Sequence, residues 1–131
     1  MFNGSWLIKV GSYTIPLSVM KLDTYSSSPA QRQDVDAYRD SDGFMHRNTV
    51  PHTATKIEFE TVPMSVKDFQ GLIKGITDNY IEGLERKVRL TYYEEEYGNY
   101  VEGDFYIPAT WTFNWYNKEI INSFRIAFIE Y

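Results

Sequence analysis

The sequence predicts a mainly β fold: a β-sandwich or partly closed barrel of seven or eight short strands with one flanking α-helix. Two observations lead to this fold class. Short segments in which apolar and polar residues alternate recur along most of the chain, separated by turn residues. One segment instead has apolar residues at three- and four-residue spacing, the pattern of an amphipathic helix. We expect residues 1–131 to form a single domain.

The composition narrows the function classes. The chain of 131 residues is 43% hydrophobic and 24% charged, which is ordinary for a globular protein. It has no cysteine, so we expect neither disulfides nor a thiolate metal site. A net charge of −5 argues against nonspecific nucleic-acid binding, which needs basic patches, and we expect no sequence-specific nucleic-acid binding either. With no run of eighteen apolar residues and no signal-peptide pattern, we expect no membrane partner and synthesis in a reducing cytoplasm.

The predicted helix covers residues 65–77. Ser65 is a favourable N-cap, and Asp68 three residues later completes a capping arrangement. A helix this short needs tertiary packing of its apolar face, because it is marginal alone. The residues that share this face are Val66, Phe69, Leu72, Ile73 and Ile76.

The strands are predicted from alternation and from the turn residues between them. Before the helix we expect a first strand over 5–10 that resumes at 13–15 after a break at Gly11-Ser12, and further strands over 17–25, 44–50 and 54–61. After it we expect strands over 85–93, 100–107, 110–116 and 121–131, with an acidic turn over 94–99.

Residues 26–43 lack a clear strand or helix pattern. A structureless segment of this length is uncommon in a compact domain unless it is functional or disordered. It begins with Ser26-Ser27-Ser28-Pro29, a loop signal, and ends with the turn signal Ser41-Asp42-Gly43. Its mixed charges around a tyrosine suit a subunit contact, although a flexible solvated loop is the plain alternative. The candidate subunit-contact residues are Arg32, Asp34, Asp36, Tyr38, Arg39 and Asp40.

A search for catalytic or metal-binding patterns finds no support for an enzyme. The chain has no nucleophile elbow, phosphate-binding loop or dinucleotide fingerprint. The spacing of His46 and His52 places no third metal ligand. The pattern Asp40-x-Asp42-Gly43 imitates part of a calcium loop but lacks its first and last ligands. We therefore expect no catalytic residue, no cofactor and no metal.

The segment 110–116 places Trp111, Phe113 and Trp115 on one face of a predicted strand. Such a row either fills the core or, if exposed, stacks against sugar rings. Period-two spacing favours the core, because half-buried strands have this pattern. A monomeric carbohydrate- or ligand-binding β-domain that uses Trp111 and Trp115 is thus the alternative function, and it requires solvent-exposed tryptophans in a cleft.

The chain also resembles a family of small prophage proteins encoded among tail genes of phages that infect Gram-positive bacteria. The residues that carry the resemblance are Asn3-Gly4-Ser5-Trp6-Leu7-Ile8-Lys9-Val10-Gly11, Gln31-Arg32-Gln33-Asp34, Arg39-Asp40-x-x-Gly43 with His46-Arg47, and Arg125-Ile126-Ala127-Phe128-Ile129-Glu130-Tyr131. The resemblance covers nearly the whole chain, and its motifs are structural and not catalytic.

The order of elements is similar to the tail-tube fold of tube, tail-terminator and distal-tail proteins. The resemblance implies that 65–77 is the flanking helix and that 26–50 is an arm bridging neighbouring subunits. It implies a structural tail or baseplate component that assembles into a closed ring, expected to be a hexamer. Its partners would be copies of itself and neighbouring tail proteins, and its place would be the virion tail after synthesis in the bacterial host cytoplasm.

Overall fold

The structure, a computed structural model, describes residues 1–32, 34–49, 54–108 and 111–131, and for 34–36 and 49 the description covers the backbone alone. The elements in chain order are β1 (Ile8–Val10), β2 (Tyr13–Thr14), η1 (Leu17–Val19), β3 (Met20–Gln31), β4 (Asp34–Arg39), β5 (Met45–Thr49), β6 (Ala54–Thr61), β7 (Met64–Ser65), α1 (Val66–Thr77), β8 (Tyr80–Glu82), β9 (Lys87–Glu94), β10 (Asn99–Tyr106), β11 (Ile120–Ile121) and β12 (Arg125–Glu130). Within these ranges, no helix has the length and apolar character to cross a membrane.

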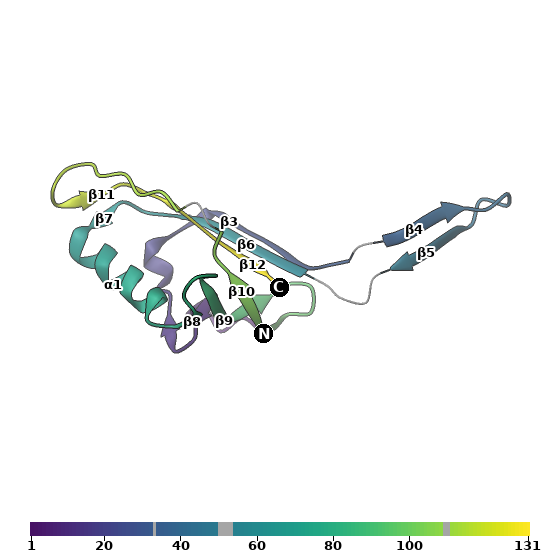
Figure 1. Cartoon of the computed structure of the whole chain (residues 1–131), viewed down its shortest axis with the longest axis horizontal. Helices are drawn as coiled ribbons and strands as arrows, with labels where there is room; N and C mark the ends of the chain where they lie inside the picture. The colour runs from purple at the N-terminus through teal and green to yellow at the C-terminus, as the bar shows by residue number, and fades with distance from the viewer. Residues whose placement is uncertain (33, 50–53, 109–110) are drawn as a thin grey trace.

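An antiparallel sheet forms the body of the molecule, as the mainly β prediction requires. Its eight strands follow the order β2-β1-β9-β10-β12-β6-β3, and β8 also pairs with β9. Two smaller sheets consist of β7 with β11 and of β4 with β5. Figure 1 shows the second of these as a hairpin that projects from the body along the long axis of the molecule. The predicted fold class, mainly β with a flanking helix, is confirmed.

The core lies on one face of the body sheet, and alternation along each strand places it there. On β9, Val88, Leu90 and Tyr92 are buried, as their period-two spacing predicts. The same alternation buries Phe59 on β6 and Phe128 on β12. Because these strands are neighbours in the sheet, their apolar side chains form one continuous cluster.

The helix α1 covers this cluster in the manner its sequence predicts. Ser65 is the N-cap, and its Oγ accepts the backbone N–H of Asp68 at 3.1 Å. Leu72 and Ile76 are buried, whereas Phe69 is partly buried and its ring centroid lies 5.0 Å from that of Phe113. The apolar stripe of the helix is thus its contact surface with the core.

Residues 26–43 are not the structureless segment that their composition predicts. Residues 26–31 continue β3, in which Ser26 pairs with Glu58 and Ser28 with Lys56 of β6. The loop assignment was wrong because β3 is the outer strand of the sheet path, where polar residues face water and Pro29 needs no ladder partner for its missing N–H. Residues 34–39 then form β4 of the hairpin.

The C-terminal part also differs from the predicted long strands. The structure has two separate strands, β11 and β12, where the sequence predicts one strand over 121–131. Within 111–116 the described residues form no strand, and Trp115 makes one isolated bridge to Ile121. The alternation of apolar residues therefore predicted continuous strands in this part of the chain, whereas the folded protein has two short strands and an irregular segment.

Candidate functional site: the projecting hairpin

The hairpin is an antiparallel ladder of β4 and β5 closed by a tight turn. Tyr38 pairs with His46, and Arg39 pairs with Met45. The turn is closed by the backbone N–H of Asp40, which donates to the Phe44 carbonyl oxygen at 2.9 Å. The turn predicted at residues 41–43 is present, and Gly43 supplies the positive φ of 88° that the turn needs.

The Asp40 carboxylate organises this turn. Its Oδ1 accepts the backbone N–H groups of Asp42 and Phe44, each at 3.0 Å. Its Oδ2 lies 2.8 Å from Nε2 of His46, whose ring stacks on Tyr38 with centroids 4.9 Å apart. The hydrogen bond from His46, followed by those from the turn backbone, lowers the pKa of Asp40 below its ordinary value. A charged Asp40 therefore stabilises the turn.

Apolar side chains of the hairpin remain exposed. Tyr38 is 55% exposed, Phe44 70% and Met45 48%. A two-stranded hairpin with no cover on either face is only marginally stable in water. Exposed aromatic and methionine side chains of this kind are typical of protein–protein interfaces. The hairpin thus has the composition of a contact surface.

The structure places the six candidate contact residues in three separate positions. Tyr38, Arg39 and Asp40 lie together at the outer half of the hairpin, where Arg39 Nη1 donates to the Gly43 carbonyl oxygen at 2.9 Å. Asp34 and Asp36 lie in the ladder of β4, and their side chains are outside the described residues. Arg32 lies apart from these, at the edge of the body.

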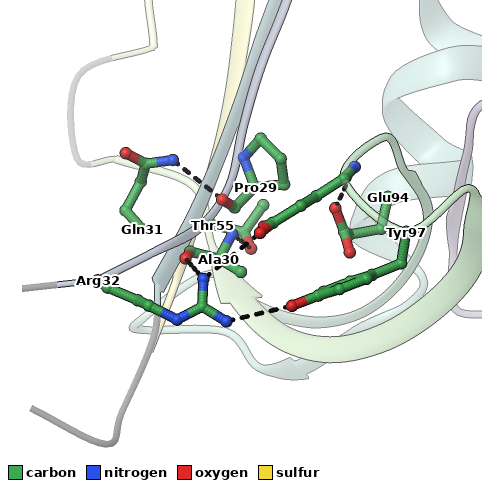
Figure 2. Close-up of polar contacts among 8 residues, drawn as sticks. Pro29, Ala30, Gln31, Arg32, Thr55, Glu94 and Tyr97 are labelled. Carbon is green, nitrogen blue, oxygen red and sulfur yellow. Dashed lines mark hydrogen bonds and ion pairs between the residues drawn. The ribbon is translucent and has the colours of Figure 1, made fainter.

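Arg32 fastens the root of the hairpin to the turn between β9 and β10. Its Nη2 donates to the Tyr97 hydroxyl at 3.3 Å, and its Nη1 lies 3.5 Å from Oε1 of Glu96 (Figure 2). Nearby, Ser27 Oγ donates to Oε2 of Glu95 at 2.8 Å. Arg32 was predicted to contact a neighbouring subunit. In the structure it also contacts Tyr97 and Glu96 of its own chain.

A buried polar cluster lies beneath this root and centres on Thr55, which is 2% exposed. Thr55 Oγ1 accepts the backbone N–H of Ala30 at 2.9 Å (Figure 2). The same oxygen lies 3.3 Å from the Tyr92 hydroxyl. The Thr55 N–H donates to Oε1 of Glu130 at 2.9 Å. Burial raises the pKa of Tyr92, so this hydroxyl keeps its proton.

Sequence reasoning missed several residues of this region. Phe44 and Met45 carry a usable signal, since apolar residues directly after a turn in an unpartnered hairpin have no core to enter. Thr55 carries no such signal, because its partners are 25, 37 and 75 residues away in the chain.

The two tryptophans of the alternative function do not share a site. Trp111 is partly buried against the core and lines a pocket of about 340 Å³ with Lys56 and Arg125. Trp115 is 58% exposed and does not line that pocket. The prediction of a buried Trp115 was wrong, because this segment does not run as a strand with one buried face.

The metal question concerns His46 and His52. His46 pairs with Asp40, and His52 lies outside the described residues. Within the described ranges, no group of three or more histidine, aspartate or glutamate side chains is arranged to hold a metal ion.

Two solved structures contain chains with a fold similar to that of this protein. Similar chains occur in structures titled "Tail of empty GTA particle computed with helical refinement, C6 symmetry" and "Virion of native gene transfer agent (GTA) particle". In both cases the TM-score is 0.56 at 16% sequence identity, over 100% of this chain and 94% of the other. This likeness shows a shared fold.

Sequence comparisons give a family without an activity. No curated protein matches the chain. One family model matches residues 1–131, and its description is "Family of unknown function (DUF6711)". Because the match spans the whole sequence, the chain belongs to this family.

Proposed function

We propose that this protein is a structural component of a phage-like tail or baseplate that assembles with copies of itself into a closed ring. The observation that carries the proposal is the projecting hairpin, which exposes Tyr38, Phe44 and Met45 without cover from the body. A shared fold with chains of gene transfer agent particles supports the tail assignment. The resemblance to prophage tail-region proteins of Gram-positive hosts supports it independently.

A hexamer is the expected ring. One of the similar chains belongs to a gene transfer agent tail that has C6 symmetry. If subunits of this protein pack against each other as those subunits do, its ring would also contain six copies. Within such a tail, neighbouring tail proteins would contact the two faces of the ring. The protein would act as a distal-tail, tube or tail-terminator-like part, with Arg32, Asp34, Asp36, Tyr38, Arg39 and Asp40 in or beside the subunit contact.

The test is replacement of residues 34–49 by a short glycine-serine turn. A deletion that started at residue 30 would remove Ala30, which bonds to Thr55 of the body, so the replacement begins beyond the root. Circular dichroism melting should show a body that folds as before, because none of the side chains described within 37–48 is buried. Sedimentation and electron microscopy at high concentration, with neighbouring tail proteins added, should show that ring formation is lost.

A narrower pair of variants separates the hairpin from general surface hydrophobicity. Replacing Tyr38, Phe44 and Met45 by serine should abolish assembly. Replacing Ile81 and Leu84, which are 58% and 97% exposed on another part of the surface, by serine also removes exposed apolar side chains and should leave assembly intact. Rings formed by the hairpin variants, or an intact protein that stays monomeric with its tail partners present, would show the proposal to be wrong.

A further inference from the structure

A second exposed aromatic patch lies on the turn between residues 114 and 122. Trp115 is 58% exposed and Tyr116 is 72% exposed. Adjacent, exposed tryptophan and tyrosine side chains are unusual on an unpartnered surface and are the residue types enriched at binding hot spots. We call Trp115 and Tyr116 the aromatic turn.

Local hydrogen bonds hold the aromatic turn in one conformation. The N–H of Tyr116 donates to the Ile120 carbonyl oxygen at 3.0 Å. The side-chain Oδ1 of Asn117 accepts the N–H groups of Glu119 at 2.8 Å and Ile120 at 2.9 Å. Because the backbone is already ordered, binding through these aromatic rings loses little conformational entropy.

The turn is also attached to the helix. The Glu119 carbonyl oxygen accepts the N–H of Val66, the first residue of α1, at 3.0 Å. This N–H is one of those that a helix leaves without an internal partner. A backbone hydrogen bond therefore attaches the aromatic turn to the first residue of α1.

The aromatic turn and the hairpin lie at opposite ends of the molecule. Figure 1 shows β11, which follows the aromatic turn, at one end of the long axis and the β4–β5 hairpin at the other. Two such patches cannot meet within one chain. A contact between them joins different copies head to tail, and a contact of this heterologous kind closes into a ring when the rotation between copies allows it.

An exposed charge lies beside each patch, and these two charges are opposite in sign. Lys118 follows the aromatic turn and is exposed, and Asp42 precedes Phe44 at the hairpin tip and is also exposed. Among the described residues, neither side chain has an ion-pair or hydrogen-bond partner. Asp42 and Lys118 are therefore an opposite pair of charges available for a contact between copies, and the exposed Glu119 beside Lys118 also has no ion-pair partner among the described residues.

We propose that the hairpin tip of one copy docks on the aromatic turn of a neighbouring copy, with Tyr38, Phe44 and Met45 against Trp115 and Tyr116. In this contact Asp42 faces Lys118 of the neighbour. The inference rests on the proposed function, since it names the surface that receives the hairpin. The hairpin at one end of the molecule and the aromatic turn at the other would thus form the same contact between each pair of neighbouring copies.

Charge reversal tests the contact directly. Asp42→Lys or Lys118→Asp alone should weaken self-association about tenfold or more in sedimentation experiments, because each places like charges together. The double variant reverses the pair, keeps the net charge and should recover association to within about threefold of the original. Asp23→Lys, at an exposed residue of β3, is the control for the change in net charge and should have little effect.

Cross-linking between copies supplies a second, independent readout. The chain has no cysteine, so Ser41→Cys and Glu119→Cys variants can be mixed and treated with a short bis-maleimide without background. We expect a cross-linked dimer from this mixture. Ser41→Cys mixed with Gly83→Cys, in the β8–β9 turn, is the matched control and should cross-link much less.

The outcomes separate this inference from the proposed function. If the protein forms rings but the charge-swapped double variant stays weak, or the Ser41–Glu119 yield equals the control yield, the hairpin docks elsewhere and the inference is wrong. In that case, loss of ring formation after replacement of residues 34–49 would still support the proposal that the hairpin is an assembly arm. An intact protein that never associates would overturn both.

Discussion

In the body sheet, the strands bury every second side chain: Leu90 and Phe105 are fully buried and lie in one apolar cluster. In the β4–β5 hairpin, which has the same antiparallel geometry, Tyr38 and Phe44 stay more than half exposed. The body is held by long-range burial, whereas the hairpin is held by its ladder and by the bonds of Asp40. The same antiparallel structure thus forms a buried core in the body and an exposed surface in the hairpin, because the chain's own residues cover only the body sheet.

The largest expected difference comes from aromatic truncation in each region. Phe105→Ala should lower the free energy of unfolding by about 3–5 kcal/mol, since it empties a buried site beside Tyr92. Phe44→Ala should change it by less than about 0.5 kcal/mol, because this ring has no cover in the single chain. Denaturant unfolding followed by circular dichroism measures both. Equal losses would show that the hairpin is packed against the body.

The polar root of the hairpin belongs energetically to the body. Thr55→Val should cost about 1–3 kcal/mol, because the Ala30 N–H loses its acceptor in a buried place. Thr55→Ser keeps a hydroxyl and should recover most of this loss in the same denaturant experiment. A valine variant as stable as the original protein would mean that water replaces the hydroxyl.

Two glycines of helix α1, Gly71 and Gly75, provide a matched pair of substitutions in the body. An added Cβ at Gly75 would lie 2.5 Å from Cδ1 of Tyr13, so Gly75→Ala should cost about 1–3 kcal/mol despite the better helix propensity of alanine. At Gly71 nothing lies within 4 Å, and Gly71→Ala should stabilise by up to about 1 kcal/mol. Thermal melts with opposite shifts would confirm that Gly75 is kept for close packing. Two stabilising substitutions would contradict this reason.

The smallest effect is a local pH dependence of the hairpin. Hydrogen bonds from His46 and the turn backbone lower the pKa of Asp40, so the stabilisation they give is fully present above the ordinary aspartate value of about 3.9 and disappears as the pH falls through the lowered pKa. Amide signals of Asp42 and Phe44 in an NMR titration should report this loss.

Asp40→Asn is the control for the titration, because it removes the titrating carboxylate. In that variant the acid-dependent change at residues 42 and 44 should vanish, while amides of β9 remain as in the original protein. A transition of the same size in the variant would assign it to another group.

Much of the fold followed from residues close together in the chain. The cap at Ser65, the apolar stripe with Leu72 and Ile76, and the alternation on β9 are all confirmed. These features depend on spacing within a few residues, which the sequence displays directly. The turn before Phe44 followed in the same way, because it depends on the conformational freedom of Gly43.

The candidate site was predicted only in part. The sequence indicated a contact segment with Tyr38, Arg39 and Asp40, and the structure places these residues together on the hairpin. It did not indicate that Arg32 would lie at the root beside Tyr97, nor that Trp115 would be exposed. Both depend on which distant segments pack nearby.

The sequence by itself determined the type of most elements, the helix cap, the core face of most strands and the turn at the hairpin tip. Only the tertiary structure decided that β3 pairs with β6, that Thr55 joins the hairpin root to Tyr92 and Glu130, and that two apolar patches remain uncovered at opposite ends. The physical reason is the distance along the chain over which each kind of interaction acts. Propensity, capping and periodicity act over a few residues, whereas burial depends on which parts of the chain are brought together after long loops are closed.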